Sequence, residues 1–366
     1  MIDPEIVYDK LAEKYKQPGF PHFRDLLQAM MNPEEGEIVL ALSEPLTPTE
    51  LAKKMNVDET ALAKKMDKLA RRGVLFRGKE QYVAWGNAHQ LNARVMFSSD
   101  QNLPPNLLEL RRQDQRYSGQ PYAEIDGLLK MSAARGKQFL RVLPARLAIL
   151  ANPKIRPEQV LWYEDVAEMM KRSEMIGMVD CDCRRIYHRC NKPLDTCLHF
   201  GKKIIGYEIG RGGRMKVITV EEAIALLDAA AKGGLVHNTL ENCASTLPGV
   251  LCSCCNDCCS TLEPAMHDGK IHEIMSPSRY RPTVDRELCI GCQTCFKSCP
   301  FHAIEMEQIP GSPKMKARVI EAKCMGCGVC ILQCKKQALI FEIVRPPDHI
   351  PPKPAARPPG LNLNVR

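Results

Sequence analysis

The sequence predicts an α+β multidomain protein, and three observations lead to this class. The chain has 366 residues, which is enough for two or three domains of ordinary size. Hydrophobic residues make up 45% of the chain, so each domain can bury a core. Amphipathic helical patterns fill the N-terminal half, whereas all 18 cysteines lie beyond residue 180, so the two halves differ in chemistry.

Residues 34–86 have the element order of a winged helix-turn-helix, and we predict a winged-helix-like domain over residues 1–95. Helices are predicted over 34–42, 48–55 and 59–72, followed by a hairpin over 74–85. The third helix exposes candidate contacts to DNA or to a partner protein: Lys64, Lys65, Lys68, Arg71 and Arg72. Such a domain also serves as a protein-docking module with solvated lysines, so nucleic acid is the weaker expectation.

The centre of the chain is expected to be helical. Residues 96–175 are interpreted as a helical linker region, with a helix that begins at Pro157 and ends at Met170. Residues 176–275 are expected to form a mostly helical Cys-rich middle domain that binds metal or clusters. Its clearest helix is capped by Thr219. The glycine-rich segment 206–213 is interpreted as a loop, because its spacing is not that of a phosphate-binding loop.

Two cysteine runs of identical spacing lie 35 residues apart near the C-terminus, which indicates an internal duplication. Two residues between successive thiols bend the chain around one cubane, and nearby glycines let the backbone approach it. Structural zinc uses separated Cys-x2-Cys pairs instead, so this spacing favours two [4Fe–4S] clusters. The fourth cysteine of each run faces the other cluster. The predicted ligands are Cys289, Cys292, Cys295 and Cys334 for cluster 1, and Cys324, Cys327, Cys330 and Cys299 for cluster 2.

With Pro300 after its fourth cysteine, the first run resembles the motif of bacterial two-[4Fe–4S] ferredoxins, and the resemblance covers residues 281–344. It implies a ferredoxin-like two-cluster α+β module over residues 280–345. Short strands are expected over 318–320 and 339–341. The second run has Lys335 where the first has proline, a departure that does not touch a ligand.

The other ten cysteines crowd into 79 residues, where no single spacing identifies the metal. The candidate ligands are Cys181, Cys183, Cys190, Cys197, Cys243, Cys252, Cys254, Cys255, Cys258 and Cys259. Adjacent cysteines point in different directions, so each Cys-Cys pair is expected to give one ligand to each of two clusters. One or two further iron–sulfur clusters are the leading expectation, and zinc or buried structural thiols are the alternatives. These runs resemble those of a loosely characterised group of anaerobic proteins that carry two ferredoxin clusters, which implies no activity.

Clusters without a visible flavin, nicotinamide or molybdenum motif predict an iron–sulfur electron-transfer protein or subunit. It would relay single electrons to or from a redox partner protein or a larger oxidoreductase complex. One alternative is a redox- or oxygen-sensing winged-helix DNA-binding regulator. Another is an oxidoreductase with a substrate-binding cluster in residues 181–259.

The net charge of the chain and the composition of its two ends bear on these hypotheses. The formal net charge of +8 first favours an acidic partner such as nucleic acid, but each cluster with its four thiolates adds about −2, so two clusters lower it to about +4. No run of about 18 apolar residues predicts a membrane helix, and the N-terminus lacks a signal-peptide pattern, so a cytoplasmic location is expected. The proline-rich tail over 346–366 is expected to be extended and poor in tertiary contacts.

Overall fold

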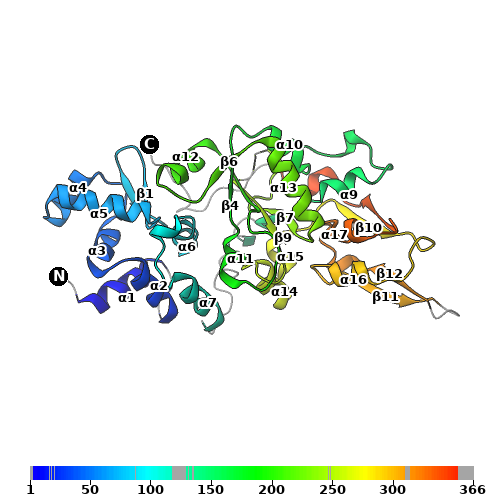
Figure 1. Ribbon diagram of the computed structural model, residues 1–366, viewed down its shortest axis with the longest axis horizontal. Coiled ribbons are helices and arrows are strands. Elements are labelled where there is room, and N and C mark those ends of the chain that lie inside the picture. The colour runs from blue at the N-terminus through cyan, green and yellow to red at the C-terminus, as the bar shows by residue number, and fades with distance from the viewer. Residues whose placement is uncertain are drawn as a thin grey trace. The chain divides into compact units, whose positions relative to one another are not determined.

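The structure is a computed structural model (Figure 1). It describes residues 3–117, 129–245, 247, 249–309 and 314–352, apart from positions 16, 18, 20, 87, 131, 134 and 135. Contacts divide the chain into two compact units. In the described residues, unit 1 consists of residues 3–117 and 206–215, and unit 2 consists of 129–205 and 216–352. The mixture of helices and strands is that of an α+β multidomain protein. No helix in the described residues is long and apolar enough to cross a membrane.

Unit 1 is built mainly of helices. Helices α1 to α5 come first, and a hairpin and two more helices follow them. Capping boxes at Asn32 and Thr47 begin the third and fourth helices, and Asp58 caps the fifth. The helices and hairpin predicted over residues 34–86 are therefore present close to their predicted bounds. The elements are α1 (Pro4–Lys14), α2 (Pro21–Met30), α3 (Pro33–Ala41), α4 (Pro48–Met55), α5 (Glu59–Arg71), β1 (Leu75–Arg77), β2 (Tyr82–Ala84), α6 (Ala88–Met96), η1 (Asp100–Asn102) and α7 (Leu107–Tyr117).

A segment from much later in the chain completes unit 1. It includes the end of α12 (Lys202–Gly210), whose Glu208 is fully buried and ion-paired with Arg94 at 2.9 Å. Arg211 also pairs with Glu208 and donates a hydrogen bond to the carbonyl of Arg94. The glycine spacing predicts a loop here, and this prediction is wrong over its first half. The side chains between the glycines hold a helix in place through buried ion pairs, which glycine spacing does not reveal.

Unit 2 is organised around a seven-stranded sheet of order β6-β4-β5-β8-β7-β3-β9. All neighbouring strands are antiparallel except β3 and β9. The expectation of a mostly helical middle domain is therefore wrong. The strands are β3 (Leu140–Val142), β4 (Ile176–Val179), β5 (Cys197–Phe200), β6 (Lys216–Ile218), β7 (Val236–Thr239), β8 (Val250–Cys254) and β9 (Met275–Ser276).

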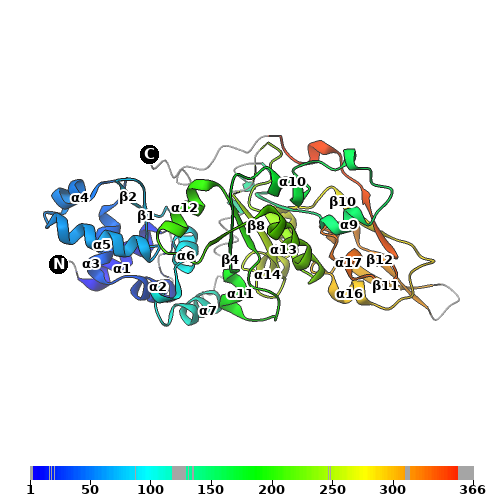
Figure 2. The same ribbon diagram turned by 45° about the horizontal axis from the view of Figure 1, so that its top comes forward.

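The register gives this sheet two chemically different faces. Leu198 on β5 is paired with Leu251 on β8, and both lie in a hydrophobic core with α10 (Val166–Lys171) and α13 (Val220–Lys232). Figures 1 and 2 show these two helices beside the sheet. Because side chains alternate along a strand, the next pair, Cys197 and Cys252, points to the opposite face. One face is therefore aliphatic, and the other presents thiols.

The errors in the central region have local causes. Strand β8 has the alternation of a strand, but its two cysteines within five residues resemble a metal-binding loop. Residues 140–142, expected in a helical linker, form a buried strand too short to show a period. The helix predicted from Pro157 to Met170 is instead a short 3₁₀ turn, η2 (Pro157–Gln159), followed by α10. The helix capped by Thr219 is confirmed as α13.

Short helices connect the strands of unit 2. They are α9 (Arg146–Leu150), α11 (Asp182–Tyr187), α14 (Leu262–His267) and α15 (Ile271–Ile274). Of these, α11 ends where His188 adopts a left-handed conformation with φ of 49°, which turns the chain into the segment that contains Cys190. That turn matters for the metal centres described below.

The C-terminal part of unit 2 contains two similar halves. β10 (Tyr280–Val284) pairs with β13 (Leu339–Ile343), and β11 (Ile304–Gln308) pairs with β12 (Met315–Val319), both antiparallel. The strands expected over 318–320 and 339–341 are thus present, with the first shifted toward the N-terminus. In each half a short helix follows a cysteine loop, and the two helices contact each other. They are α16 (Thr294–Ser298) and α17 (Val329–Gln333), with the turn η3 (Glu321–Lys323) between the halves.

The first residues of the predicted tail are held against unit 2. The turn η4 (Pro347–His349) places His349 so that its Nε2 donates to the carbonyl of Pro277 at 2.9 Å. The backbone N–H of Ala244 donates to the carbonyl of Pro351 at 2.9 Å. The expectation of few tertiary contacts is therefore wrong for the described residues 346–352. The remainder of the tail lies outside the described residues.

Candidate metal centres

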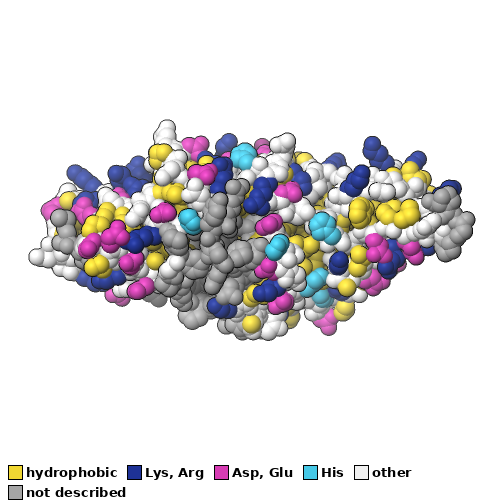
Figure 3. All heavy atoms as spheres, turned by 90° about the horizontal axis from the view of Figure 1, so that it is seen from below, with side chains coloured by type: hydrophobic (Ala, Val, Ile, Leu, Met, Phe, Trp, Pro, Cys, Tyr) yellow, Lys and Arg dark blue, Asp and Glu magenta, His cyan; other side chains and the backbone are white. Residues whose placement is uncertain are grey.

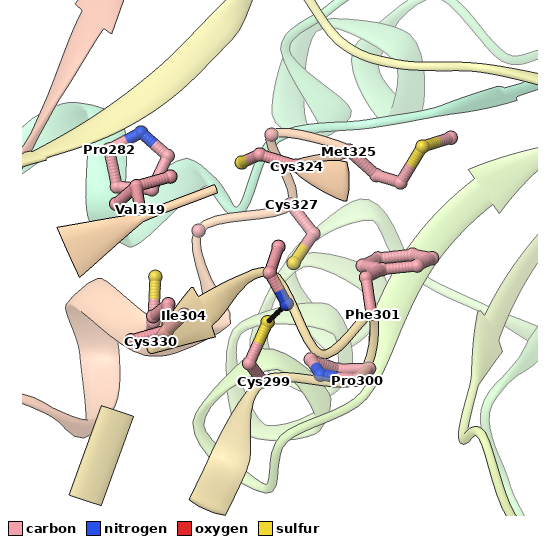
Figure 4. A pocket seen from close by; sticks show the side chains of 13 residues that line it. Pro282, Cys299, Pro300, Phe301, Ile304, Val319, Cys324, Met325, Cys327 and Cys330 are labelled. Carbon is pink, nitrogen blue, oxygen red and sulfur yellow. Dashed lines mark hydrogen bonds between the residues drawn. The ribbon is translucent and has the colours of Figure 1, made fainter. Parts of the chain in front are cut away.

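Two apolar pockets in the C-terminal part of unit 2 are each lined by four cysteines. We name the first the inner pocket; it is lined by Cys299, Cys324, Cys327 and Cys330. We name the second the outer pocket; it is lined by Cys289, Cys292, Cys295 and Cys334. Each pocket thus takes three thiols from one run and the fourth from the other run. Figure 4 shows the four cysteines of the inner pocket approaching one space from different segments.

The duplication repeats the environment of the fourth thiol. The backbone N–H of Ala303 donates to the Sγ atom of Cys299 at 3.3 Å, and the N–H of Ala338 donates to that of Cys334 at 3.3 Å. Such hydrogen bonds stabilise a thiolate and help to set the reduction potential of a bound cluster. Burial raises the pKa of the Cys330 thiol well above its ordinary value, so its deprotonation depends on a bound cation. The donor set and its amide partners therefore fit thiolate-bound metal.

Glycine is required where the inner pocket meets the preceding part of unit 2. Gly328 has a φ of +81°, and a Cβ atom there would lie 2.7 Å from the ring of Phe341 and 3.0 Å from the Cβ of Ala148. The backbone N–H of Ala145 donates to the carbonyl of Cys327 at 2.9 Å. The inner pocket is therefore packed directly against the segment that follows β3.

The outer pocket lies at the surface. The Cys292 side chain is exposed, and its pKa is lowered by hydrogen bonds from Thr294. Three large apolar side chains close to it in sequence are also exposed: Leu288 by 51%, Ile290 by 62% and Phe296 by 46%. Exposed apolar residues clustered beside a reactive group are typical of an interaction surface.

Six of the remaining thiols form a row that begins on the thiol face of the sheet. Cys197 and Cys252 interact across β5 and β8, and Cys252 interacts in turn with Cys254. Cys259 then links Cys254 to Cys183, whose Sγ also lies 3.4 Å from Ser260 Oγ. Cys181 completes the row through a hydrogen bond with Cys183. We call these six residues the thiol row.

Three other thiols form a compact group, which we call the thiol triad. The Sγ atom of Cys190 lies 3.8 Å from that of Cys255 and 3.7 Å from that of Cys258. All three sulfur atoms lie within 4.8 Å of one another. Each Cys-Cys pair is thus divided, with Cys254 and Cys259 in the row and their neighbours in the triad, as the sequence leads one to expect.

The tenth thiol of the middle region lies apart from the row and the triad. The Sγ atom of Cys243 is 3.3 Å from Ser245 Oγ and near the carbonyl of Pro352, at the start of the tail.

Arg184 is a buried cation at the centre of this region. Its side chain is buried, with Nε donating to the carbonyl of Pro193 and Nη1 to that of Ser253, both at 2.8 Å. It also hydrogen-bonds with the thiol of Cys255. Arg184 therefore supplies positive charge where thiolates gather, and no sequence pattern distinguishes it from its neighbour Arg185.

The basic residues predicted on the third helix do not form one free surface. Arg72 is largely buried and pairs with Glu35 at 2.9 Å, and Lys65 pairs with Glu34. The other three, Lys64, Lys68 and Arg71, are exposed. Arg72 therefore belongs to the internal structure of unit 1, and the exposed basic surface is smaller than predicted.

Comparison with known proteins identifies one part of the chain. Residues 288–338 match the family described as 4Fe-4S dicluster domain, which indicates [4Fe–4S] cluster binding in this part. "Protein Pixie" of Drosophila melanogaster is 34% identical over 58 residues, which are 16% of this chain and 10% of that protein. The chain thus spans about a tenth of the length of that relative. No solved structure matches. The chain is therefore similar to 4Fe-4S dicluster domains over its two cysteine runs, and iron–sulfur electron transfer is the activity that this similarity suggests.

Proposed function

We propose that the protein relays single electrons between its own interior and a partner oxidoreductase, with one [4Fe–4S] cluster in each four-cysteine pocket. When bound, such clusters supply reversible one-electron chemistry. The observation that supports a relay is the unequal placement of the pockets. The inner pocket is packed against the rest of unit 2, and the outer pocket is at the surface.

Several hydrogen bonds from neighbouring segments hold the inner pocket in place. Ser278 Oγ donates to the carbonyl of Gly326 at 2.7 Å, and Asn152 Nδ2 donates to that of Phe341 at 2.5 Å. Gln333 Nε2 donates to the carbonyl of Lys232, at the end of α13, at 2.6 Å. These contacts fix the cysteine loop in a preorganised polar environment, which is what a site needs if its geometry is to change little when its charge changes.

The surface around the outer pocket has the composition of a docking surface. The exposed apolar residues Leu288, Ile290 and Phe296 lie in the same loop and helix as Cys292, and Lys297 is exposed beside them. An apolar centre with basic neighbours suits transient contact with an acidic protein, because charge steers the encounter and apolar burial holds it. We propose that an acidic redox protein docks here.

A charge placed on this surface tests the proposal. Leu288→Glu should leave the iron content unchanged, because Leu288 is exposed and does not line the outer pocket, but it should slow electron exchange with an acidic flavodoxin about tenfold, since it adds repulsion where the partner binds. Val217→Glu is the matched control, because Val217 is a similarly exposed aliphatic residue, 53% accessible, on β6. Equal rates for the two variants would contradict docking at the outer pocket.

The regulator alternative has less support. We propose that unit 1 is a winged-helix-like docking domain, since two of the five basic residues of its third helix already pair with carboxylates. On the face drawn in Figure 3, acidic and basic side chains are intermixed rather than separated. A gel-shift assay with oxidised and reduced protein tests this directly. Specific, redox-dependent DNA binding at moderate salt would favour the regulator.

A further inference from the structure

We propose that Cys190, Cys255 and Cys258 bind a single soft divalent metal ion such as Zn²⁺, with one coordination position open to an external ligand. This site is separate from the two four-cysteine pockets. It involves no residue of the two C-terminal runs, and its test does not depend on the partner protein.

The sulfur separations fit one ion. Four thiolates around Zn²⁺ at about 2.3 Å form a tetrahedron whose corners are about 3.8 Å apart. The measured separations from Cys190 are 3.8 and 3.7 Å. The thiolates of a cubane each bind a different iron, so their sulfur atoms are about 6 Å apart. A disulfide would bring two of them to about 2 Å. The triad therefore matches a mononuclear thiolate site.

The local sequence supports the same conclusion. Cys255 and Cys258 are separated by two residues, which is the spacing of a zinc knuckle, and they follow directly after β8. Cys190 is brought to them by the left-handed turn at His188. The backbone N–H of Arg189 donates to the Sγ atom of Cys258 at 3.3 Å, which favours a thiolate there.

The charge of the site is also balanced. Three thiolates and one divalent ion have a net charge of −1, and the guanidinium of Arg184 hydrogen-bonds with Cys255. Because Arg184 is buried and fixed by two carbonyls, it supplies this charge without reorganising.

The triad differs from the thiol row in how closely its sulfur atoms are grouped. In the described part of the chain, the triad is the only group of three such ligands whose atoms all lie within 4.8 Å of one another.

The fourth position is open toward solvent. Structural zinc sites are closed by four protein ligands, whereas sites that bind external ligands keep three. Among the described residues, no fourth cysteine, histidine or carboxylate joins the group. Cys190 is partly accessible, and Arg189 beside it is exposed. The position therefore suits water or a small anionic donor such as a thiolate.

The experiment uses the full chain, purified without oxygen. We expect about one zinc per chain in addition to iron, and loading with Co²⁺ should give the thiolate-to-cobalt absorption of a tetrahedral site. Cys190→Ser should lower Zn²⁺ affinity at least tenfold, with Cys258→Ser as a second variant. Cys243→Ser is the matched control, since this thiol lies outside the triad, and it should keep the ion. A small thiol such as 2-mercaptoethanol should shift the cobalt bands of the unmodified protein.

Three results would overturn the proposal. The first is a protein that takes up no zinc or cobalt at this site. The second is a Cys190→Ser variant that loses about four iron per chain, which would place a cubane at the triad. The third, cobalt bands that do not move with added thiol, would reject the open position. Unchanged cluster spectra of the C-terminal pockets show that each variant is folded.

Discussion

The backbone N–H of Ala145 donates a 2.9 Å hydrogen bond to the carbonyl of Cys327, which ties the segment after β3 to the cysteine loop of the inner pocket. Three residues later, Ala148 faces Gly328 so closely that a Cβ atom on the glycine would lie 3.0 Å from its own Cβ. The inner pocket is therefore part of the packing between the segment that follows β3 and the C-terminal part of unit 2. Disturbing that packing should disturb cluster binding as well.

Gly328→Ala should destabilise the protein and weaken retention of the inner cluster. The left-handed backbone costs an alanine about 1 kcal/mol, and the contacts with Phe341 and Ala148 add roughly 1–3 kcal/mol. Gly269→Ala is the control, because Gly269 also has a positive φ, +69°, but nothing lies within 4 Å of its added Cβ. Melting temperature and iron content, measured without oxygen, should fall more for Gly328→Ala. Equal losses would show that backbone strain alone is responsible.

Arg184→Met should destabilise unit 2 by about 3 kcal/mol. The substitution keeps most of the side-chain volume but leaves the carbonyls of Pro193 and Ser253 without a buried donor. Arg156→Met is the control, since Arg156 is exposed and its ion pair with Glu158 is exposed as well, so its loss should change stability by less than about 0.5 kcal/mol. Thermal scans at one scan rate compare the two variants. A small shift in the melting temperature of Arg184→Met would mean that water replaces the guanidinium as the hydrogen-bond donor to these carbonyls.

The two cysteine runs were readable from the sequence because their chemistry is local. Three of the four thiols in each pocket lie within seven residues, and the duplication shows where the fourth belongs. Helix starts were equally readable, since Thr47 and Thr219 each form a capping box within four residues. In these cases the residues that determine the structure are neighbours in the chain.

The sheet and the triad could not be predicted from the sequence, because both depend on contacts between residues that are far apart in the chain. Cys197 becomes a neighbour of Cys252 only when β5 pairs with β8, and Cys190 meets Cys255 although the two are 65 positions apart in the sequence. The Cys-x2-Cys spacing of Cys255 and Cys258 was visible, but it gave no indication of the third ligand. A dense cysteine run hides the alternation of a strand, and it gives candidate ligands without grouping them.

Stability should fall as the pH is lowered from 7 to 5, and His237 should account for part of this change. Burial lowers the pKa of His237 from 6.5 to about 4, so the folded protein keeps the imidazole neutral while the unfolded chain takes up a proton below pH 6.5. The stabilising contribution is therefore present above about pH 7 and is lost as the pH falls toward 4. At pH 5 the loss is about 2 kcal/mol.

His237→Gln removes this titration and should flatten the pH dependence of the melting temperature between pH 5 and 7. His237 Nδ1 lies 3.0 Å from Ser253 Oγ, a contact that a glutamine amide can replace. His267→Gln is the control, because the His267 side chain is 71% exposed and its substitution should leave the slope unchanged. If the melting temperatures of His237→Gln and the unmodified protein depended on pH with the same slope, His237 would not be the source of this pH dependence.

Exchange of the fourth ligand between the runs gives the sharpest test of the two pockets. Cys334 belongs to the second run in sequence but lines the outer pocket, and Cys299 belongs to the first run but lines the inner one. Cys334→Ser should therefore alter the same electron paramagnetic resonance signal as Cys289→Ser, and Cys299→Ser the same signal as Cys327→Ser. If each run bound its own cluster, the pairs would be exchanged, and Cys334→Ser would match Cys327→Ser. Because Ala338 and Ala303 donate equivalent 3.3 Å hydrogen bonds to the two exchanged thiols, the substitutions remove equivalent ligands, and any difference between the spectra reports the pocket.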